Sequence, residues 1–383
     1  MRVLRIVSSP FTHGPRDYRL SRALIKAGHD VTAVAWATQG SHALNENWDG
    51  IDIHRVRSPW YAKPLAKDLF RLPSFWRRAY GKAVELHREK GFDLVQCREL
   101  DTLLVGVRLK KRFGLKLIYD SHDIYPYLLA AAFPRWIANM AIPVEKRLVR
   151  NVDRIFVTAE THKQYFEGIG DRPVSVVMNC KELLGTEYQA PPAGRPFTVL
   201  YVGTLSRARY LLELVDVVSQ LRDVRCLIGG IGVASYARAV GDRCSRVPNA
   251  DFVGVVPFDG VIPMTREADV VFLMIDPSIP NDSISLANKQ FEAMVCGRPI
   301  ICSRGTYSGQ LTEQEETGLV IEHSKEALRQ AIVSLRDNAE LRERLGRNAL
   351  KAAVTKYNWA QEEQKYLAVY EELAAELRLP STR

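Results

Sequence analysis

Residues 1–36 read MRVLRIVSSPFTHGPRDYRLSRALIKAGHDVTAVAW. Two short apolar runs, 3–7 and 31–36, flank a segment whose apolar residues have helical spacing. Gly28 stands where that helix must end. A strand, a helix and a second strand in this order predict a parallel strand pair joined by a helical crossover.

The same alternation of strand-like and helix-like segments recurs along the chain, with one break. Proline and glycine crowd residues 183–196, so no regular element can form there. Helices are expected at 103–112, 209–221 and 286–296. Further strands are expected at 93–97, 115–119, 154–158 and 174–178 before the break, and at 197–202, 224–228, 269–274 and 299–302 after it. This pattern predicts an α/β protein with two Rossmann-like, doubly wound parallel sheets.

The length of 383 residues also favours two domains, because single hydrophobic cores stop growing below this size. We expect an N-terminal domain at 1–182, a linker at 183–196 and a second domain at 197–358. Residues 359–383 form a predicted helix with an apolar stripe, which must pack on another element. We expect that helix to cross back to the first domain.

The charge balance favours an anionic partner. Lys and Arg number 53 against 44 Asp and Glu, a net charge of +9, which suits nucleic acid, anionic lipid or a phosphorylated substrate. The basic residues are spread and form no nucleic-acid-binding motif, so no nucleic acid is expected. The opening residues do not resemble a signal peptide and no window is apolar enough to span a membrane, which predicts a cytoplasmic protein. The six dispersed cysteines are expected to be buried thiols.

Residues 61–78 interleave basic and aromatic side chains. Such a stretch can lie on an anionic membrane, and peripheral attachment to the inner face of the cell membrane is one expectation. The alternative is a solvated face over an ordinary core.

The turn after the strand at 197–202 is the first candidate site, because ligands of parallel sheets bind beyond the carboxyl ends of the strands. Gly203 allows a ligand to approach the backbone, and Arg207 and Arg209 suit a phosphate. The alternative is a pair of solvated arginines.

The second candidate site is the polar loop and predicted helix at 281–299. Ser285, Lys289, Glu292 and Cys296 are spaced by four, three and four residues, which predicts one shared helix face. The cation could hold a diphosphate and the carboxylate could hold ribose hydroxyls. The alternative is a surface Lys–Glu pair.

Two further candidates lie in the first domain. His122 stands between Asp120 and Asp123 after a predicted strand, where it could bind ligand hydroxyls or transfer a proton; the alternative is a helix N-cap cluster. The first strand–helix turn holds Gly14 and Arg16, which an acceptor or a phosphate could approach.

Neither glycine-containing turn has the dinucleotide fingerprint, which disfavours a dehydrogenase. The first strand–helix turn has a single glycine, and the glycines at 229–232 lack the full spacing. We expect residues 229–232 to form a tight turn between a strand and a helix.

Taken in order, these segments resemble the family 4 glycosyltransferases of the GT-B fold over nearly the whole chain. The motifs that carry the resemblance are 16–19 with 23–32, 119–126, 151–158, 201–205, 288–294 with 297–299, and 357–359. The resemblance implies two domains that face each other across a cleft. It also implies a retaining hexosyl- or N-acetylhexosaminyltransferase that uses a UDP- or GDP-sugar.

The resemblance also implies roles for the candidate residues. Arg209, Lys289 and Arg207 would stabilise the diphosphate, Glu292 would hold the ribose, and His122 would contact the donor sugar. The remaining implied contacts are Gly203, Ser285 and Asn288 on the donor side, and Gly14, Arg16 and Asp123 on the acceptor side. The acceptor would be a glycan or a lipid-linked molecule of cell-surface polysaccharide or glycolipid biosynthesis. No protein nucleophile, metal or cofactor is implied.

Two positions depart from the family pattern. The family motif often has a second glutamate where this chain has Ile284, and Asp282 or backbone groups could replace it. Tyr210 stands where many members have glycine. The first departure keeps a non-catalytic sugar-nucleotide-binding module as an alternative, alongside a GT-B epimerase or sugar-phosphate synthase.

Overall fold

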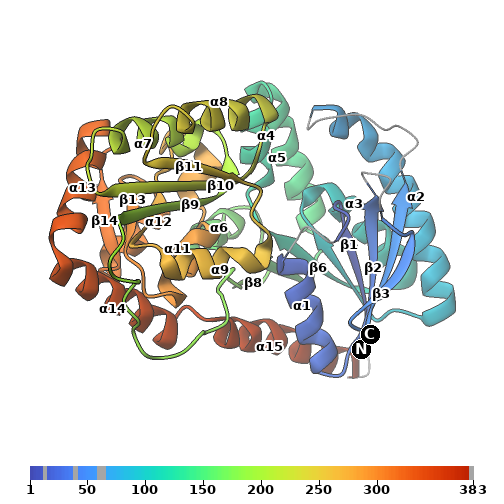
Figure 1. Cartoon of the computed structure of the whole chain (residues 1–383). Coiled ribbons are helices and arrows are strands. Elements are labelled where there is room, and N and C mark those ends of the chain that lie inside the picture. Colours follow the sequence, from blue (N-terminus) through green and yellow to red (C-terminus); the bar gives the residue numbers. More distant parts are fainter. Residues whose placement is uncertain (12–14, 38–41, 58–65, 379–383) are drawn as a thin grey trace. The chain divides into compact units, whose positions relative to one another are not determined.

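The structure is a computed structural model that describes residues 1–11, 15–37, 42–57 and 66–378. Contacts between residues divide the chain into two compact units (Figure 1). The first unit combines Met1–Met178 with Glu363–Arg383, and the second is Asn179–Glu362. The segment expected as a linker, 183–196, therefore lies in the second unit.

The described part of the first unit contains an eight-stranded sheet in the order β3-β4-β2-β1-β5-β6-β7-β8. The strands are β1 (Arg2–Val7), β2 (Asp30–Ala37), β3 (Asn45–Trp48), β4 (Ile51–Arg57), β5 (Leu94–Arg98), β6 (Lys116–Ser121), β7 (Arg154–Val157) and β8 (Val174–Val176). All neighbouring pairs are parallel except β3 with β4. Those two strands form a hairpin because Asp49 and Gly50 both have positive φ, as a type I′ turn requires.

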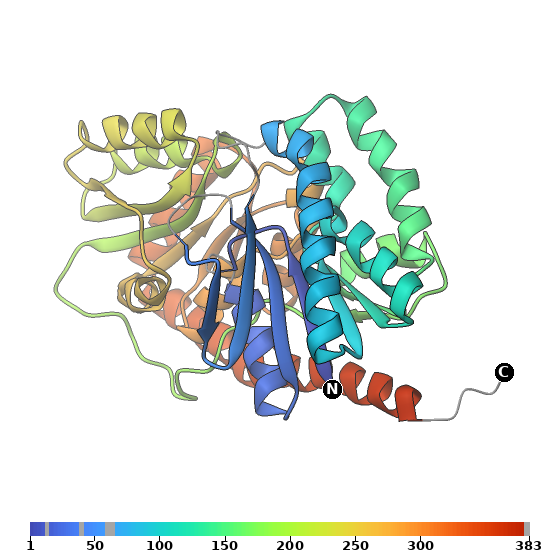
Figure 2. The same ribbon diagram turned by 90° about the vertical axis from the view of Figure 1, so that its right-hand side faces the viewer.

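Helices cover both faces of this sheet. They are α1 (Pro15–Lys26), α2 (Ala66–Lys90), α3 (Leu100–Phe113), α4 (Tyr125–Ala132), α5 (Arg135–Val149), α6 (Glu160–Glu167) and α15 (Trp359–Arg378). Helices α2 and α3 pack on one face, and the long α2 runs alongside the blue strands in Figure 2. A Cβ on Gly106 of α3 would lie 2.3 Å from Cys97 Sγ, so glycine allows α3 its close approach to β5.

The other face of this sheet carries charged residues under α1 and α15. Parallel register places Arg5 beside Gln96 and Arg98 beside Asp120, with all four side chains on one face. Arg5 hydrogen-bonds Asp17 of α1, while Tyr366 and Tyr370 of α15 donate to Gln96 Oε1.

The second unit contains a six-stranded sheet, with every described pair parallel, in the order β11-β10-β9-β12-β13-β14. The strands are β9 (Phe197–Leu205), β10 (Val224–Gly232), β11 (Ala250–Gly254), β12 (Val270–Leu273), β13 (Ile300–Ser303) and β14 (Gly318–Ile321). The helices are η1 (Arg207–Arg209), α7 (Leu211–Val218), α8 (Ala234–Cys244), α9 (Phe258–Glu267), α10 (Pro280–Ile284), α11 (Asn288–Val295), α12 (Tyr307–Gln314), α13 (Lys325–Asp337) and α14 (Ala339–Thr355). Both sheets confirm the predicted α/β class.

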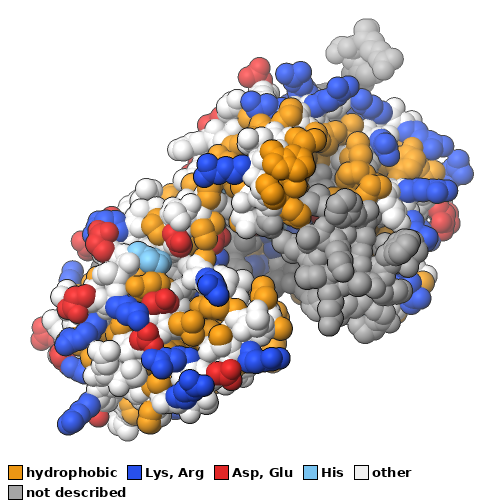
Figure 3. Space-filling view, turned by 90° about the horizontal axis from the view of Figure 1, so that it is seen from above, with side chains coloured by type: hydrophobic (Ala, Val, Ile, Leu, Met, Phe, Trp, Pro, Cys, Tyr) orange, Lys and Arg blue, Asp and Glu red, His pale blue; other side chains and the backbone are white. Residues whose placement is uncertain are grey.

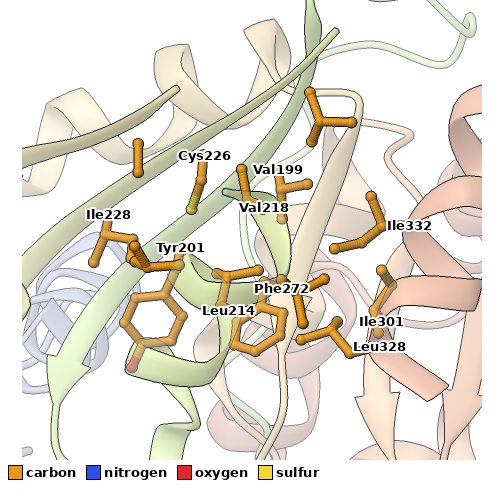
Figure 4. Close-up of a cluster of buried hydrophobic side chains, with 14 of the residues drawn as sticks. Val199, Tyr201, Leu214, Val218, Cys226, Ile228, Phe272, Ile301, Leu328 and Ile332 are labelled. Carbon is orange, nitrogen blue, oxygen red and sulfur yellow. The ribbon is translucent and has the colours of Figure 1, made fainter. Parts of the chain in front are cut away.

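The core of the second unit lies between its sheet and helices α7, α8 and α13. Figure 4 shows Val199 and Tyr201 of β9 packed with Phe272 of β12 and Leu214 of α7. The alternate residues of β9 face α9 on the opposite side, as the period of two in a strand requires. The six cysteines, all in described segments, are buried thiols as expected.

The glycines at 229–232 correct one expectation. They do not form a turn but continue β10, where Gly230 pairs with Gly203 and Gly232 with Leu205 of β9. A Cβ on Gly230 would lie 1.7 Å from the Gly203 carbonyl oxygen, and one on Gly232 would lie 2.1 Å from the Leu205 carbonyl oxygen. Glycine occurs here because two backbones approach closely in the sheet.

Strand order fixes where ligands can bind each sheet. The order in which successive strands are added to the sheet reverses between β1 and β5 in the first unit, and between β9 and β12 in the second. Crevices beyond the carboxyl ends of strands at such switch points are the usual binding places in open α/β sheets. Among the described helices, none is both long enough and apolar enough to cross a membrane.

Candidate active site

The donor-side candidates meet at the carboxyl end of β9, beside the switch point of the second unit. Lys289, in the first turn of α11, lies over Tyr201 with its Nζ 4.3 Å from the ring centroid. A Cβ on Gly203 would lie 2.2 Å from that Nζ. The absence of a side chain at Gly203 therefore makes room for the ammonium group.

The Lys289 ammonium is poorly solvated. Burial lowers the pKa of Lys289 to about 8, with smaller contributions from Glu292, which raises it, and from Arg209 and Lys181, which lower it. Within the described residues, no carboxylate lies at ion-pair distance from it. A desolvated cation without a paired anion binds an incoming phosphate more strongly than a solvated one does.

Arg209 ends the short helix η1 that follows β9. Its Nη2 lies 3.1 Å from Asp282 Oδ2 of α10, the short helix within the loop after β12. The two loops are also joined through the backbone, since the Asp276 N–H donates to the Ala208 carbonyl at 3.0 Å. Arg207 is exposed on the same turn.

The backbone conformation of Tyr210 is one that glycine adopts most easily, and glycine is the residue that the resemblance led us to expect at this position. Its φ of 56° and ψ of 33° are left-handed, a conformation that glycine adopts without strain. The Tyr210 ring packs on His323 with the centroids 4.3 Å apart. This residue lets the chain turn from η1 into α7 at the cost of backbone strain.

Glu292 has a buried partner that the sequence did not reveal. Its Oε1 lies 2.9 Å from Lys181 Nζ, and both residues are buried. The backbone of Lys181 is fixed by a bridge to Asn358, and its carbonyl accepts the Trp359 N–H at 2.9 Å. The only sequence signal for Lys181 is its place just after a predicted strand.

The predicted shared face at 285–296 needs correction. Helix α11 begins at Asn288, which is exposed, so Lys289 and Glu292 share a helix but Ser285 precedes it. Ser285 has an extended backbone and its Oγ donates to the Asn281 carbonyl at 2.7 Å. That hydrogen bond ends α10 and separates Ser285 from the face of α11.

In the first unit, His122 lies at the carboxyl end of β6. The backbone N–H of His122 donates to Glu99 Oε1 at 3.2 Å, and its backbone carbonyl accepts from Thr158 Oγ1 at 2.7 Å. Burial, followed by the Arg98 guanidinium, lowers the pKa of His122, so the imidazole is neutral near pH 7. Its Nε2 lies 3.7 Å from Asp120 Oδ2, which is too far for a hydrogen bond.

The remaining acceptor-side candidates have different surroundings. Arg16 is buried, with its Nη2 3.1 Å from Asp120 Oδ1 and its Nη1 donating to the Val177 carbonyl at 2.6 Å. Arg16 and nearby Arg5 keep Asp120 ionised and lower its pKa against the effect of burial. Asp123 is half-buried beside His122, and Gly14 lies outside the described residues.

Glu99 is a further candidate that sequence reasoning missed. It precedes α3 with φ 62° and ψ 165°, a region that only glycine adopts readily. Burial, then the Asp123 carboxylate, raises the pKa of Glu99 well above its ordinary range. Among the described residues, Glu99 Oε2 and His122 Nε2 have no hydrogen-bond partner. Strain and unsatisfied polar atoms at a strand end are typical of a ligand site.

The helix-cap alternative for residues 120–123 does not hold. Helix α4 is preceded by Ile124, and no side chain caps it. Ser121 Oγ instead donates to the Asp123 carbonyl at 2.7 Å. The described part of the chain has no cluster of three or more His, Cys, Asp or Glu residues placed to hold a metal ion; the expectation of metal-independent chemistry stays a prediction.

Two family models match the chain. One is described as "Glycosyl transferase 4-like domain" and matches residues 13–180; the other is "Glycosyl transferases group 1" and matches residues 196–338. The chain is 25% identical over 404 residues to D-inositol 3-phosphate glycosyltransferase of Corynebacterium glutamicum (strain R), covering 94% of this chain and 92% of that protein.

Solved structures share the fold. Sucrose-phosphate synthase from Thermosynechococcus elongatus aligns with a TM-score of 0.82 at 20% identity, over 98% of this chain and 100% of that one. Anabaena HepE in complex with UDP-glucose aligns with a TM-score of 0.73 at 16% identity, over 97% and 100%. The chain thus belongs to the group 1 glycosyltransferases of the GT-B fold, with a glycosyl transferase 4-like domain preceding the group 1 domain.

Proposed function

We propose that this glycosyltransferase moves a hexosyl or N-acetylhexosaminyl group from a UDP- or GDP-sugar to a glycan or lipid-linked acceptor, with retention of anomeric configuration. The product would belong to cell-surface polysaccharide or glycolipid biosynthesis. The observation that carries the proposal is the Lys289 ammonium, which lies against Gly203 with no carboxylate partner among the described residues. A UDP-glucose complex of HepE, which shares the fold, supports a nucleotide-sugar donor of the UDP type.

The leaving diphosphate is the proposed ligand of Lys289 and Arg209. As the bond to the sugar breaks, negative charge grows on the phosphate, and a fixed cation in a poorly solvated place stabilises that charge. Arg209 is paired with Asp282, so the diphosphate must compete with this carboxylate for the guanidinium. Lys289 is therefore expected to contribute more than Arg209.

Glu292 is the proposed ribose ligand, and Lys181 is its positioning residue. The 2.9 Å ion pair holds one carboxylate oxygen of Glu292, leaving the other to accept hydrogen bonds from sugar hydroxyls. The ion pair with Lys181 thereby orients the carboxylate toward its ligand.

In the first unit, we propose that His122 and Glu99 bind sugar hydroxyls. A neutral imidazole can donate or accept one hydrogen bond at Nε2, and the raised pKa of Glu99 favours the protonated carboxyl group, which can donate. With retention by same-face attack, the acceptor hydroxyl transfers its proton to the leaving phosphate. No covalent bond to the protein is needed.

The test is a screen of nucleotide-sugars for release of nucleoside diphosphate, with and without lipid-phosphate acceptors. Native chain, Lys289→Ala, Glu292→Ala and the surface control Lys325→Ala would be compared. Release by the native chain and the control, lost in both site variants, would support transfer, and NMR of the product anomer would test retention.

The same screen separates the rival functions. Nucleotide binding without release from any donor would favour a non-catalytic module, for which Ile284 is the motivating residue. Release with a free sugar phosphate as acceptor would favour a synthase, and conversion of a donor into its epimer without net release of nucleoside diphosphate would favour an epimerase.

A further inference from the structure

The second unit contains a cavity of about 720 Å³ at the amino ends of its strands. Phe197, where β9 begins, and Pro299, which precedes β13, both line it. Gly203 of the candidate active site lies six residues further along β9, roughly 20 Å away at about 3.3 Å per residue. The cavity is therefore at the opposite end of the sheet from the residues assigned to sugar transfer.

A proline-rich segment forms one wall of this cavity. Residues 190–194 read Ala-Pro-Pro-Ala-Gly, and all five line it. The segment is fixed at both ends, because Arg298 donates to the Gln189 carbonyl at 2.7 Å and Arg195 Nη1 lies 2.7 Å from Asp269 Oδ2. The two prolines restrict the backbone between these anchors. The wall is therefore a built part of the second unit.

Arg298 brings to the cavity a charge that no carboxylate balances. Its side chain is 2% exposed, and its guanidinium donates to the backbone carbonyls of Gln189 and Arg266. Within the described residues, no carboxylate lies at ion-pair distance from it. Burial lowers the pKa of Arg298 below its ordinary value, because the water that would solvate the cation is excluded.

Arg342 is a second guanidinium of this kind, again without a carboxylate at ion-pair distance in the described part of the chain. Its Nη1 donates to the Leu335 and Arg336 carbonyls at the end of α13, and its Cζ lies 5.5 Å from the centroid of the Phe197 ring. These bonds use both hydrogens of Nη1 and leave the N–H groups of Nε and Nη2 to bind a ligand. The protein thus holds Arg342 in place without using all of its donors.

The acidic residues around the cavity do not compensate these two cations. The lining contains four arginines and three acidic residues. Asp269 is paired with Arg195, Glu343 lies 2.6 Å from Nη2 of Arg347, and Asp223 is exposed. On the face of the second unit that Figure 3 shows at the left, Lys and Arg are instead interspersed with Asp and Glu. The cavity therefore attracts anions more strongly than that mixed surface does.

Arg195 adds buried donors that lack acceptors. Its Nε and Nη2 are buried and have no hydrogen-bond partner among the described residues. The ion pair of Nη1 with Asp269 fixes the orientation of this guanidinium. Buried donors without partners are rare in folded proteins and need an explanation. An anion held under residues 190–194 would supply the missing acceptors.

We propose that this cavity binds a small organic phosphomonoester. A phosphate group carries about two negative charges near neutral pH and three acceptor oxygens, which match two uncompensated guanidiniums and the unused donors of Arg342 and Arg195. The organic part would pack on Tyr188, Phe197 and the prolines of 190–194. The volume lies within the roughly 300–1,000 Å³ of small-molecule sites. The proposal requires no nucleotide-sugar and no turnover, so it does not rest on the proposed function.

The test is isothermal titration calorimetry of the full chain with phenyl phosphate as the probe. We expect binding that weakens with added salt. Inorganic phosphate lacks the organic part and should bind at least tenfold more weakly, and uncharged phenol should give no measurable binding. Tighter binding of phthalate, a dicarboxylate with the same ring, would overturn the choice of a phosphate ligand. Absence of phenyl phosphate binding would overturn the whole proposal.

Variants locate the bound phosphate. Arg342→Gln should weaken phenyl phosphate binding on the order of 10- to 100-fold, because hydrogen bonds to a charged group are lost. Arg342→Lys keeps the charge without the planar fork and should give an intermediate loss. Arg329→Gln, at an exposed arginine of α13 outside the lining, and Lys289→Ala, in the candidate active site, should bind the probe as the native chain does. Unchanged binding in Arg342→Gln, or loss in either control, would overturn the proposal.

A second measurement separates loss of the site from misfolding, because Arg342 also holds carbonyls of α13. Phenyl phosphate should slow hydrogen exchange at 193–198 in the native chain and leave it unchanged in Arg342→Gln, while exchange in α7 without ligand stays equal in both. Slowing at 203–209 alone would place the probe in the candidate active site and overturn the proposal. The expected pattern in a chain that transfers no sugar would support the cavity and remove the proposed function.

Discussion

The two units place charge at their switch points in opposite ways. In the first unit, buried Arg5 lies 2.9 Å from Asp17 and 3.8 Å from Asp120, and Arg16 and Arg98 complete the network. In the second, Lys289 lies over an aromatic ring without a carboxylate partner among the described residues. Charges that compensate one another hold a fold together, whereas a cation without an anion is available to a ligand.

The largest effect should come from breaking the network of the first unit. Asp17→Ala removes the carboxylate that the Arg5 and Arg98 guanidiniums share, so we expect the free energy of unfolding to fall by about 3–5 kcal/mol. Urea denaturation measures this. The matched control is Asp216→Ala, whose partners Arg243 and Lys325 are largely exposed and whose loss should cost less than about 1 kcal/mol. Equal losses in the two variants would contradict the contrast between the units.

Removing the cation of the second unit should affect activity and leave stability nearly unchanged. Lys289→Ala should lower kcat/KM on the order of 100- to 1,000-fold, because a fixed cation at the leaving phosphate is lost. Steady-state kinetics with the donor found in the screen measure this, with Lys325→Ala as control. A fall of less than about threefold would assign the diphosphate to other residues.

Gly203→Ala tests whether the position of the Lys289 ammonium matters, without removing its charge. The new methyl group would overlap the Lys289 ammonium, which must move because it is the flexible end of its side chain. We expect kcat/KM to fall roughly 10- to 100-fold through misplacement. Gly185→Ala, where a Cβ would meet no atom within 4 Å, is the control. Native activity in Gly203→Ala would show that the position of Lys289 is unimportant.

Glu99→Gly tests whether strain in the first unit serves binding. Glycine relieves the φ of 62°, so the free energy of unfolding should rise by about 1–2 kcal/mol while transfer activity falls. Glu99→Gln keeps the strain and should show no such gain. A destabilised Glu99→Gly variant would mean that Glu99 is a structural residue.

The buried cation of the second unit should also give the activity a pH dependence. Because the pKa of Lys289 is lowered to about 8, the cation is present below that pH and is lost above it. The kcat/KM for the nucleotide-sugar donor should therefore fall about tenfold per pH unit above pH 8. Lys289→Arg should abolish this fall, since arginine stays protonated. A flat native profile to pH 10 would remove Lys289 from phosphate binding.

Strands were predictable because apolar runs are local. The runs at 3–7, 31–36 and 197–202 correspond to β1, β2 and the start of β9. Partners distant in sequence were not predictable: the glycines of 229–232 suggested a turn until their pairing with β9 was known. The antiparallel β3 was also missed, although Asp49-Gly50 carries a hairpin signal.

The candidate site was predictable only in part, because several of its contacts join residues that are distant in sequence. The spacing of Lys289 and Glu292 placed both on α11, but nothing local to Glu292 indicates Lys181. The strain at Glu99 is a backbone property that residue identity does not reveal. Ser285 was misplaced because its hydrogen bond to Asn281 ends one helix before the next begins.

Helix α15 makes the order of synthesis matter for this protein. Buried Tyr366 and Tyr370 donate to Gln96, and Glu376 pairs with Lys116 and Arg154, so the first unit needs residues made after the second unit. A ribosome completes the second unit while Gln96 still lacks these hydroxyl donors. Exchange of the first unit between related enzymes must therefore carry α15 with it, or leave the recipient with an uncovered polar core.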